Sequence, residues 1–337
     1  MSTQTPAQID TNRLHAIVSS LLTLEKELQA LFPGRETVIR QLLLATLTRE
    51  HVLMFGRYGT GKSDLVASFF GAFTGSNLFR ISLSKFMTES HTIGNPDFKV
   101  LRDSGQMVYP TDGLLAAQFI EFDEFFDASD VLLRTLLGIL NERQFLRGKQ
   151  CETARLHTAI AATNADPRQK QQGNDQLGAI VDRFLFIAPV KYLEKTEDRM
   201  AMYRRYRDGG KPTVCLDWKD VEYASSVLSS SICTMSDEFI GLYDAVLGDV
   251  LSANTNTAEE RERYPLSDRR RCKLLRVIQA AALLEQRTEV EPVDILAAAY
   301  AIDPGKKTTQ EIIGQFKTKG RPKIEAYIGS RQPDAAE

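Results

Sequence analysis

The chain has 337 residues, enough for one large or two ordinary domains, and a formal net charge of −2, which argues against nucleic acid as its main ligand. Its four cysteines show no C-x-x-C spacing and therefore fit reduced thiols better than a disulfide or zinc framework. No apolar run approaches the roughly 18 residues of a membrane span, and the polar start lacks a signal-peptide core, so we expect a soluble, cytoplasmic protein.

The chain opens with two predicted amphipathic helices. Apolar residues recur at helical spacing over residues 14–31, after an N-cap at Asp10 or Thr11. Pro33-Gly34 ends this helix, and a second helix follows over residues 38–47. The second helix leads directly into an apolar strand.

This strand, residues 52–55, precedes a nucleotide-binding motif. The motif is a complete G-x-x-x-x-G-K-[ST] phosphate loop, made of Gly56, Arg57, Tyr58, Gly59, Thr60, Gly61, Lys62 and Ser63. Its glycines let successive backbone N–H groups form an anion nest at the start of the next helix. Lys62 is then expected to reach the β- and γ-phosphates, and Ser63 to bind Mg²⁺. The alternative is a glycine-rich turn with an incidental Lys-Ser pair.

Four more strands are predicted after the phosphate loop, alternating with helices. They cover residues 78–83, 118–122, 156–162 and 184–190, and a helix covers residues 129–141. The alternation predicts an α/β fold with a five-stranded parallel sheet covered on both faces, in which ligands bind at the carboxyl ends of the strands. Residues 99–109, between two of these strands, could form a hairpin around Asp103-Ser104-Gly105.

Three polar residues follow strands of this sheet. Asp123 and Glu124 come after an apolar strand, where a phosphate-loop enzyme needs one carboxylate for Mg²⁺ and a second to orient the attacking water. We assign the first role to Asp123 and the second to Glu124. Asn164 ends the next strand, and its amide could hydrogen-bond the water or the γ-phosphate. Alone, these residues would indicate a solvated loop and a turn, but their position after a phosphate loop favours catalysis.

Two arginines could complete the site. Arg183 precedes the fifth strand and could act as an arginine finger on the γ-phosphate of a neighbouring subunit, or simply pair with Asp182. Arg269 lies in the first turn of a helix capped by Ser267 and could report whether a γ-phosphate is present. Three consecutive arginines there could equally form a solvated basic face.

After residue 191 the pattern changes to helices without strands. They are expected over residues 194–207, 217–228, 236–251, 267–286 and 292–301. This part is predicted to be a small all-helical domain. The residues after Pro304-Gly305 are rich in Lys and Gly and are expected to form a partly ordered or solvated tail.

Together, these motifs resemble those of the AAA+ ATPases, and within them the MoxR family, most closely its RavA branch. The resemblance covers about residues 14–303. It rests on the phosphate loop as Walker A and on the segments Phe122-Asp123-Glu124 (Walker B), Leu140-Asn141-Glu142-Arg143-Gln144-Phe145, Ala161-Ala162-Thr163-Asn164 (sensor 1), Asp182-Arg183-Phe184 (finger) and Leu266-Ser267-Asp268-Arg269-Arg270 (sensor 2).

Two positions depart from the family pattern. Arg57-Tyr58 replaces the proline-containing dipeptide common in the family's loop. Glu121 places a carboxylate where the family strand is apolar, so that strand is expected to be less buried, or Glu121 to pair with a nearby Arg. Neither departure changes the catalytic set.

The resemblance implies a fold and an activity. The fold would be an AAA+ P-loop NTPase with an N-terminal segment and helix (1–34), an α/β nucleotide-binding domain (35–192), a helical lid (193–303) and a C-terminal tail (304–337). The activity would be Mg²⁺-dependent ATP hydrolysis in a hexameric homo-oligomeric ring that remodels or activates a partner protein as a chaperone does. Residues 99–109 would be an insert and residues 145–156 a hairpin, both lining or capping the pore.

The family also implies a partner, and other functions stay open. The partner would carry a von Willebrand factor type A (vWA) domain. Alternatives are a nucleotide-gated scaffold with slow hydrolysis and a chelatase-type ATPase that drives metal insertion. A nucleic-acid motor has weak support from the basic turn Arg147-Gly148-Lys149, which the near-neutral net charge opposes.

Overall fold

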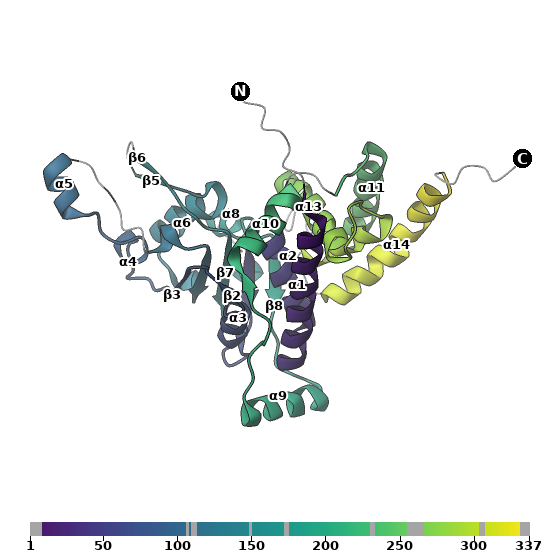
Figure 1. Cartoon of the computed structure of the whole chain (residues 1–337), viewed down its shortest axis with the longest axis horizontal. Coiled ribbons are helices and arrows are strands. Elements are labelled where there is room, and N and C mark those ends of the chain that lie inside the picture. The colour runs from purple at the N-terminus through teal and green to yellow at the C-terminus, as the bar shows by residue number, and fades with distance from the viewer. Residues whose placement is uncertain are drawn as a thin grey trace, which may run out of the picture. The chain divides into compact units, whose positions relative to one another are not determined.

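The computed structural model describes residues 9–105, 108, 113–147, 150–171, 175–229, 233–254, 266–302 and 307–330. Figure 1 labels its helices and strands. Contacts divide the chain into two compact units, Ser19–Ser225 and a second formed by Met1–Val18 with Ser226–Glu337. We call the first the sheet unit and the second the helical unit.

A five-stranded parallel sheet forms the centre of the sheet unit. Its strand order is β3-β4-β7-β1-β8, and every pair is parallel. The strands are β1 (Val52–Phe55), β3 (Leu78–Ser82), β4 (Phe119–Asp123), β7 (Thr158–Thr163) and β8 (Phe186–Pro189). The predicted α/β fold is therefore confirmed, and the carboxyl ends of β4, β7 and β1 lie side by side at one edge.

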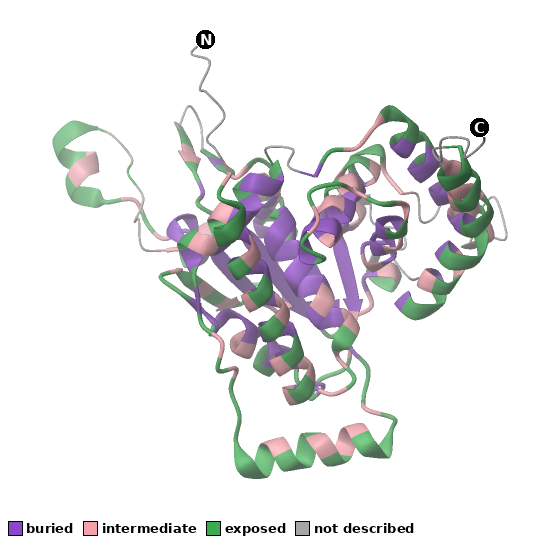
Figure 2. Ribbon diagram, turned by 45° about the vertical axis from the view of Figure 1, so that its right-hand side comes forward, coloured by how far each residue is buried: buried purple, intermediate pink, exposed green. Residues whose placement is uncertain are grey.

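Helices cover both faces of this sheet. Helices α6 (Asp130–Glu142) and α8 (Asp175–Val181) contribute to the same buried apolar cluster as Leu53, Ile120 and Ala159. The strand residues that alternate with these contact α2 (Glu36–Thr48) and α3 (Lys62–Phe70) on the other face. The central strands are accordingly buried on both sides (Figure 2), which explains why they read as continuous apolar runs.

The first helix, α1 (Thr11–Leu31), begins as predicted. The Asp10 carboxylate accepts a hydrogen bond from the Arg13 N–H at 3.0 Å, so Asp10 is the N-cap. Arg35, at the start of α2, donates a hydrogen bond to the phosphate loop, as described below.

The segment predicted as a hairpin over residues 99–109 is different in the structure. Residues Phe98–Ser104 form helix α5, after a short helix α4 (Glu89–Thr92). Asp97 caps α5 by accepting hydrogen bonds from the N–H groups of Lys99 and Val100, and Gly105 ends it with φ of 70°. Asp-Ser-Gly is thus a helix end rather than a hairpin turn. Residues 106, 107 and 109 lie outside the described part.

The hairpin expected before β7 is present. Strands β5 (Gln144–Arg147) and β6 (Gln150–Thr153) pair antiparallel. The expected turn residues Gly148 and Lys149 lie outside the described residues. The hairpin starts directly after α6, whose last turn ends at Arg143 with φ of 57°.

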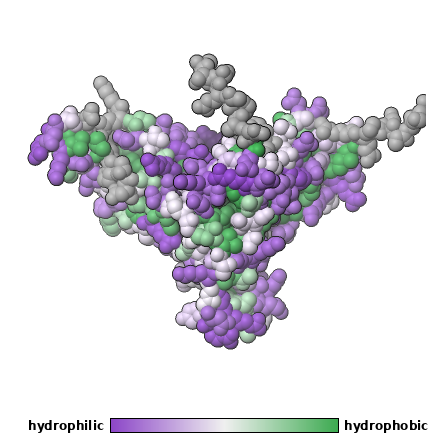
Figure 3. Space-filling model, viewed as in Figure 1, coloured by the Kyte–Doolittle hydropathy of each residue, from purple (hydrophilic) through white to green (hydrophobic). Residues whose placement is uncertain are grey.

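Residues 191–217 were expected to be helical and free of strands, and this was only partly correct. The short strand β9 (Leu216–Asp217) pairs with β2 (Phe73–Thr74) of the sheet unit. Between β8 and β9, helix α9 (Thr196–Asp208) is joined to the rest by extended segments, and each of its residues is at least partly exposed (Figure 2). The surface over α9 is mostly hydrophilic (Figure 3).

In the described part of the helical unit, the long elements lie between residues 237 and 329. They are α11 (Asp237–Asn254), α13 (Asp268–Leu284), η3 (Pro292–Tyr300), a 3₁₀ helix, and α14 (Thr309–Gly329). Helix α10 (Trp218–Ser229) spans the boundary between the two units. Helix α14 falls where the sequence predicted a tail, and it contacts α11 and η3.

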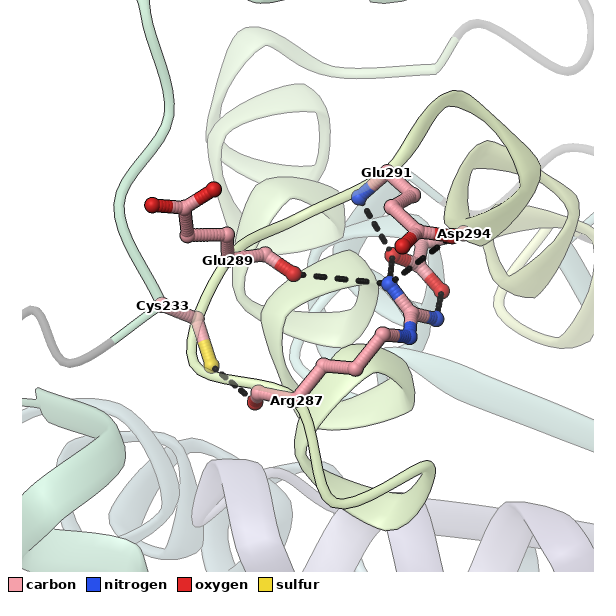
Figure 4. A network of polar contacts seen from close by, with 5 residues as sticks. All are labelled: Cys233, Arg287, Glu289, Glu291 and Asp294. Atoms are coloured by element: carbon pink, nitrogen blue, oxygen red, sulfur yellow. Dashed lines mark hydrogen bonds and ion pairs between the residues drawn. The ribbon is translucent and has the colours of Figure 1, made fainter.

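A polar network ties the end of α13 to the start of η3 (Figure 4). The Arg287 guanidinium donates two hydrogen bonds to Asp294, at 2.8 and 2.6 Å, and Asp294 also accepts from the Glu291 N–H. The Cys233 thiol donates to the Arg287 carbonyl, and burial raises the pKa of Cys233 to about 11. This thiol is therefore neutral and structural, as expected for a reduced cysteine.

Membrane insertion finds no support among the helices that the structure describes. Each of them is too short or too polar to cross a bilayer.

Candidate active site

The phosphate loop has the backbone that its glycines were expected to provide. It connects β1 to α3, and Gly59 and Gly61 have φ of 72° and 78°. Gly56 has φ of 155°, and a Cβ there would lie 2.0 Å from the Val190 carbonyl oxygen. A side chain at Gly56 would clash with backbone, and side chains at the other two positions would be strained.

Lys62 is buried and held at the carboxyl end of β1. Its ammonium donates hydrogen bonds to the carbonyls of Gly56, at 2.6 Å, and Arg57, at 3.2 Å. It also donates to Asn164 Oδ1 at 3.3 Å. Burial lowers the pKa of Lys62, while the charges of Asp123 and Glu124 oppose that shift. A buried, multiply coordinated ammonium suits an anionic ligand.

The carboxyl ends of β4 and β7 bring Glu124 and Asn164 together. Asn164 Nδ2 donates to Glu124 Oε1 at 2.6 Å, so one amide joins Lys62 to Glu124. Glu124 has φ of 50°, and its N–H donates to Asp123 Oδ1 at 3.0 Å. The expected neighbourhood of Lys62, Asp123, Glu124 and Asn164 is therefore present.

The charge state of Glu124 is shifted toward the neutral form. Burial raises the pKa of this carboxyl most, and the negative charges of Asp123 and Asp127 raise it further. Lys62 and the hydrogen bond from Asn164 oppose the rise. A carboxylate with a raised pKa is a stronger base than an ordinary one, which suits a group that orients and deprotonates water.

Ser63 and Asp123 offer the oxygen ligands that Mg²⁺ prefers. Ser63 is exposed at the start of α3, and Asp123 is half-buried at the end of β4. The described residues contain no group of three or more His, Cys, Asp or Glu side chains that could hold a metal alone. A hydroxyl and one carboxylate, completed by phosphate and water, fit the donor set of a Mg²⁺–nucleotide site.

Arg57 and Tyr58 contribute their backbone to the loop. The Arg57 carbonyl accepts from the Thr60 hydroxyl at 2.9 Å as well as from Lys62. The Tyr58 ring is 78% exposed, and its carbonyl accepts from the Tyr192 hydroxyl at 2.9 Å. The sequence motif does not reveal Tyr192, which follows β8.

Arg35 is a second residue that the sequence motif does not reveal. Its guanidinium donates to the Thr60 carbonyl at 3.1 Å and to the Lys191 carbonyl at 2.7 Å. Burial lowers the pKa of Arg35, although Glu36 and Asp198 oppose this shift. Because side chains that bind backbone carbonyls follow no fixed spacing, only the structure brings Arg35 and Tyr192 to the loop.

Arg183 lies in the turn after α8. Its guanidinium donates to the Ala179 carbonyl at 3.1 Å and lies 3.9 Å from the Asp182 carboxylate. The pairing with Asp182 that the sequence allowed is thus present, at a long distance. Its role as an arginine finger stays a prediction.

Arg269 belongs to the helical unit. Ser267 caps α13 through a hydrogen bond from the Arg270 N–H, as predicted, and Arg269 is exposed in the first turn. Arg270 is buried and donates to the Ala301 carbonyl at 2.9 Å, and Arg271 lies 3.6 Å from Asp244. Nucleotide sensing by Arg269 stays a prediction.

Two family models match the chain. Residues 19–205 match a model described as the MoxR domain in the MoxR-vWA-beta-propeller ternary systems. Residues 246–315 match a model described as an AAA lid domain.

Individual proteins resemble the chain, some in sequence and one in fold. Two uncharacterized proteins of Methanocaldococcus jannaschii are 27% and 29% identical, over 83% of the chain and 71% and 69% of the relatives. The chaperone MoxR1 of Mycobacterium tuberculosis is 25% identical over 56% of the chain and 49% of that protein. A crystal structure of a candidate ATPase from Cytophaga hutchinsonii, 20% identical, superposes with a TM-score of 0.69, covering 91% of the chain and 96% of that structure. The fold is an AAA+ α/β fold.

Proposed function

Because this chain belongs to the MoxR family of AAA+ ATPases, we propose that it hydrolyses Mg²⁺-bound ATP as a hexameric ring that remodels or activates a partner protein. The observation that supports this most is the hydrogen-bonded chain from Lys62 through Asn164 to Glu124, at the carboxyl ends of three adjacent strands. A purely structural polar cluster would not need a phosphate loop beside it.

Each residue of the site has a proposed task. The loop N–H groups and Lys62 bind the β- and γ-phosphates. Ser63 and Asp123 would hold Mg²⁺, which neutralises charge on the phosphates when bound. Glu124 orients the attacking water and accepts its proton, and Asn164 fixes the Glu124 carboxylate through its amide.

The arginines are proposed to connect the site to its surroundings. Arg183 would act on the γ-phosphate of a neighbouring subunit, and Arg269 would reach the nucleotide from the helical lid. The nucleotide-binding domain is proposed over residues 35–192 and the lid over residues 193–303. The lid-domain match over residues 246–315 supports only the later part of that range, and residues 193–225 belong to the sheet unit. Changes in the nucleotide would then move the lid and the inserts of a ring.

A vWA-domain protein is the partner that we propose. The matching family model is named for systems that combine MoxR, vWA and beta-propeller proteins. The sequence motifs favour the RavA branch of the family, so RavA-like chaperone activity is our preferred biological role. A cytoplasmic location fits the scattered reduced thiols.

Two other functions are kept as alternatives. A nucleotide-gated scaffold would hydrolyse ATP slowly, and a chelatase-type ATPase would drive metal insertion. Stimulation of steady-state turnover by a candidate protein substrate favours remodelling, whereas persistent ATP-locked rings favour the scaffold.

The central experiment compares Glu124→Gln with the wild type. We expect hydrolysis to fall by about 10²–10⁴-fold, because the amide cannot accept the proton of water, while ATP binding is retained. Glu197→Gln, at an exposed glutamate of α9, is the matched control and should hydrolyse ATP as the wild type does. Phosphate release and binding of a fluorescent ATP analogue measure the two quantities.

Lys62→Ala is expected to affect ATP binding, which Glu124→Gln leaves intact. Removal of the ammonium should weaken ATP binding itself. Wild-type turnover in Glu124→Gln, or undiminished nucleotide binding in Lys62→Ala, would contradict the assigned site.

A further inference from the structure

We propose that Tyr192 and Arg35 are positioning residues that hold the outer side of the phosphate loop and so set its affinity for nucleotide. This inference rests on the proposed function, since it concerns the same loop. It adds two residues from different parts of the chain, the start of α2 and the segment after β8, that the motif does not contain.

Four carbonyls of the loop each accept a side-chain hydrogen bond. Two are satisfied within the loop: Gly56 by Lys62, and Arg57 by both Lys62 and Thr60. The other two, at Tyr58 and Thr60, are satisfied from outside, by Tyr192 and Arg35. Tyr192 and Arg35 therefore supply the restraint that the loop does not supply for itself.

The orientation of these carbonyls decides what the loop can bind. Each peptide unit is planar, so fixing a C=O on one side directs the N–H of the same unit to the other side. An anion nest requires successive N–H groups to point inward together. Because Tyr192 and Arg35 fix the C=O groups of Tyr58 and Thr60, they also fix the N–H groups of Gly59 and Gly61 on the opposite side of the same peptide units.

The loop needs this restraint because its own sequence is permissive. Three of its eight residues are glycines, which lose the most backbone freedom on ordering, and none is proline, which would restrict φ covalently. Any freedom left in the unliganded loop must be lost when nucleotide binds and lowers the affinity. External hydrogen bonds reduce that loss before the ligand arrives.

The segment that carries Tyr192 is itself fixed against the loop. The Val190 N–H donates to the Phe55 carbonyl at 2.8 Å, and the Val190 carbonyl approaches Gly56 too closely for a side chain there. Arg35 then joins the next residue, Lys191, to Thr60. Tyr192 is thus the third consecutive residue of this segment with a link to the loop.

Helix α9 adds a second attachment farther along the same segment. Arg205 lies 2.9 Å from Asp64, which directly follows Lys62-Ser63 in α3, and its guanidinium stacks on Phe32 at 3.8 Å. The chain between β8 and α10 therefore contacts the nucleotide-binding element at two places, so Tyr192 is not at the end of a loose loop.

The test begins with Tyr192→Phe, which removes one hydroxyl and keeps the ring. We expect the Kd for ATP to rise about 3- to 10-fold, the range that one lost hydrogen bond gives. The turnover number at saturating ATP should stay close to that of the wild type, because the catalytic residues are untouched. Tyr203→Phe, at an exposed tyrosine of α9, is the control and should bind as the wild type does.

Arg35 gives a second, independent variant. Arg35→Met should weaken binding more than Tyr192→Phe, and Arg35→Lys should recover part of the loss, since Lys still donates to a carbonyl. The two changes should also be non-additive in the double variant, because both residues order the same loop. A thermal unfolding scan of each protein separates this effect from simple destabilisation.

The outcomes distinguish this inference from the proposed function. Wild-type protein that does not bind ATP would overturn the function and the inference together. Wild-type binding that is equally tight in Tyr192→Phe and Arg35→Met would overturn the inference alone. Loss of binding in step with a lowered Tm would likewise overturn it, because the residues would then act only on folding.

Discussion

At the scale of single residues, Glu121 shows how an acidic side chain is tolerated inside the sheet. Glu121 on β4 pairs in register with Arg80 on the edge strand β3, and Arg80 Nε lies 2.7 Å from Glu121 Oε2. The Glu121 side chain is 9% exposed and that of Arg80 is 48% exposed. Burial raises the pKa of Glu121, and Arg80 opposes the rise. The expected pairing with a nearby arginine is confirmed.

Arg80→Met should reveal how much the buried Glu121 carboxylate destabilises the fold when it has no partner. We expect the free energy of unfolding at neutral pH to fall by about 1–3 kcal/mol, because Glu121 loses its partner. The folded-state pKa of Glu121 already lies above its ordinary value of 4.5 and should rise further without Arg80. Stability is therefore lost as pH rises from the ordinary pKa through the raised folded pKa, and is regained toward low pH. Urea unfolding at several pH values measures this dependence.

Two variants serve as controls for that experiment. Glu121→Gln in the Arg80→Met background removes the titrating group and should abolish the pH dependence of the loss. Arg102→Met, at an exposed arginine of α5, should change little. A loss of the same size at every pH would show that Arg80 acts through packing and not through Glu121.

Residues of the site differ in how far the sequence revealed them. Lys62, Asp123, Glu124 and Asn164 follow strands in a fixed order, and parallel strands must bring such ends together, so their meeting was predictable. Arg35 and Tyr192 bind carbonyls, and every residue carries one, so no sequence pattern marks the pairing. The sequence likewise did not show that Arg270 is the buried one of the three arginines at the start of α13. Consecutive residues in one helical turn point in different directions, and three identical residues carry no pattern that tells which one faces the core.

At the scale of elements, α14 is the largest difference from expectation. Its buried residues include Ile312 and Phe316, and Gly320 lies against Val246 of α11, where a Cβ would be 2.9 Å from the Val246 side chain. Lys323 donates to Asp249 at 2.5 Å. These contacts make α14 part of the helical unit's core and not a solvated extension.

Phe316→Ala tests whether α14 stabilises that core. Because Phe316 is fully buried, its truncation should cost about 3–5 kcal/mol in the unfolding of the helical unit. Lys317→Ala, at the exposed neighbouring position, should cost little. Calorimetry that follows separate transitions is the suitable measurement, since a two-unit chain need not unfold in one step. Equal stability of the two variants would mean that α14 contributes no packing.

Strands were easier to predict than the inserts and the end of the chain, for a physical reason. Sheet strands buried on both faces are continuous apolar runs, which few other elements produce. Asp-Ser-Gly, by contrast, is compatible with both a hairpin turn and a helix end. In the structure the N-cap at Asp97 stabilises the helix that this sequence ends. In α14 only a few residues form the apolar side, and the many Gly, Pro and Lys residues made the helical pattern hard to recognise. The start of the helix was marked by Thr308 and Glu311, which form a capping box.

At the scale of the whole molecule, the proposal depends on an arginine that one subunit supplies to the site of another. Arg183 follows α8 at the amino end of β8 in the sheet unit, whereas the loop lies at the carboxyl end of β1. Adjacent parallel strands place those two ends at opposite edges of the sheet. An arginine there is suited to a neighbouring site, and head-to-tail contacts that close on themselves form a ring.

Mixing two inactive variants tests this arrangement directly. Arg183→Ala should abolish turnover and leave ATP binding nearly intact, and Lys62→Ala should lose binding but keep its Arg183. If the finger acts between subunits, a site is complete when an Arg183→Ala subunit supplies the intact phosphate loop and a neighbouring Lys62→Ala subunit supplies the intact Arg183. Random mixing in equal amounts then makes roughly a quarter of the sites complete, and turnover should recover toward that fraction. Native mass spectrometry establishes that mixed rings form; if they form and no activity returns, Arg183 does not act in trans.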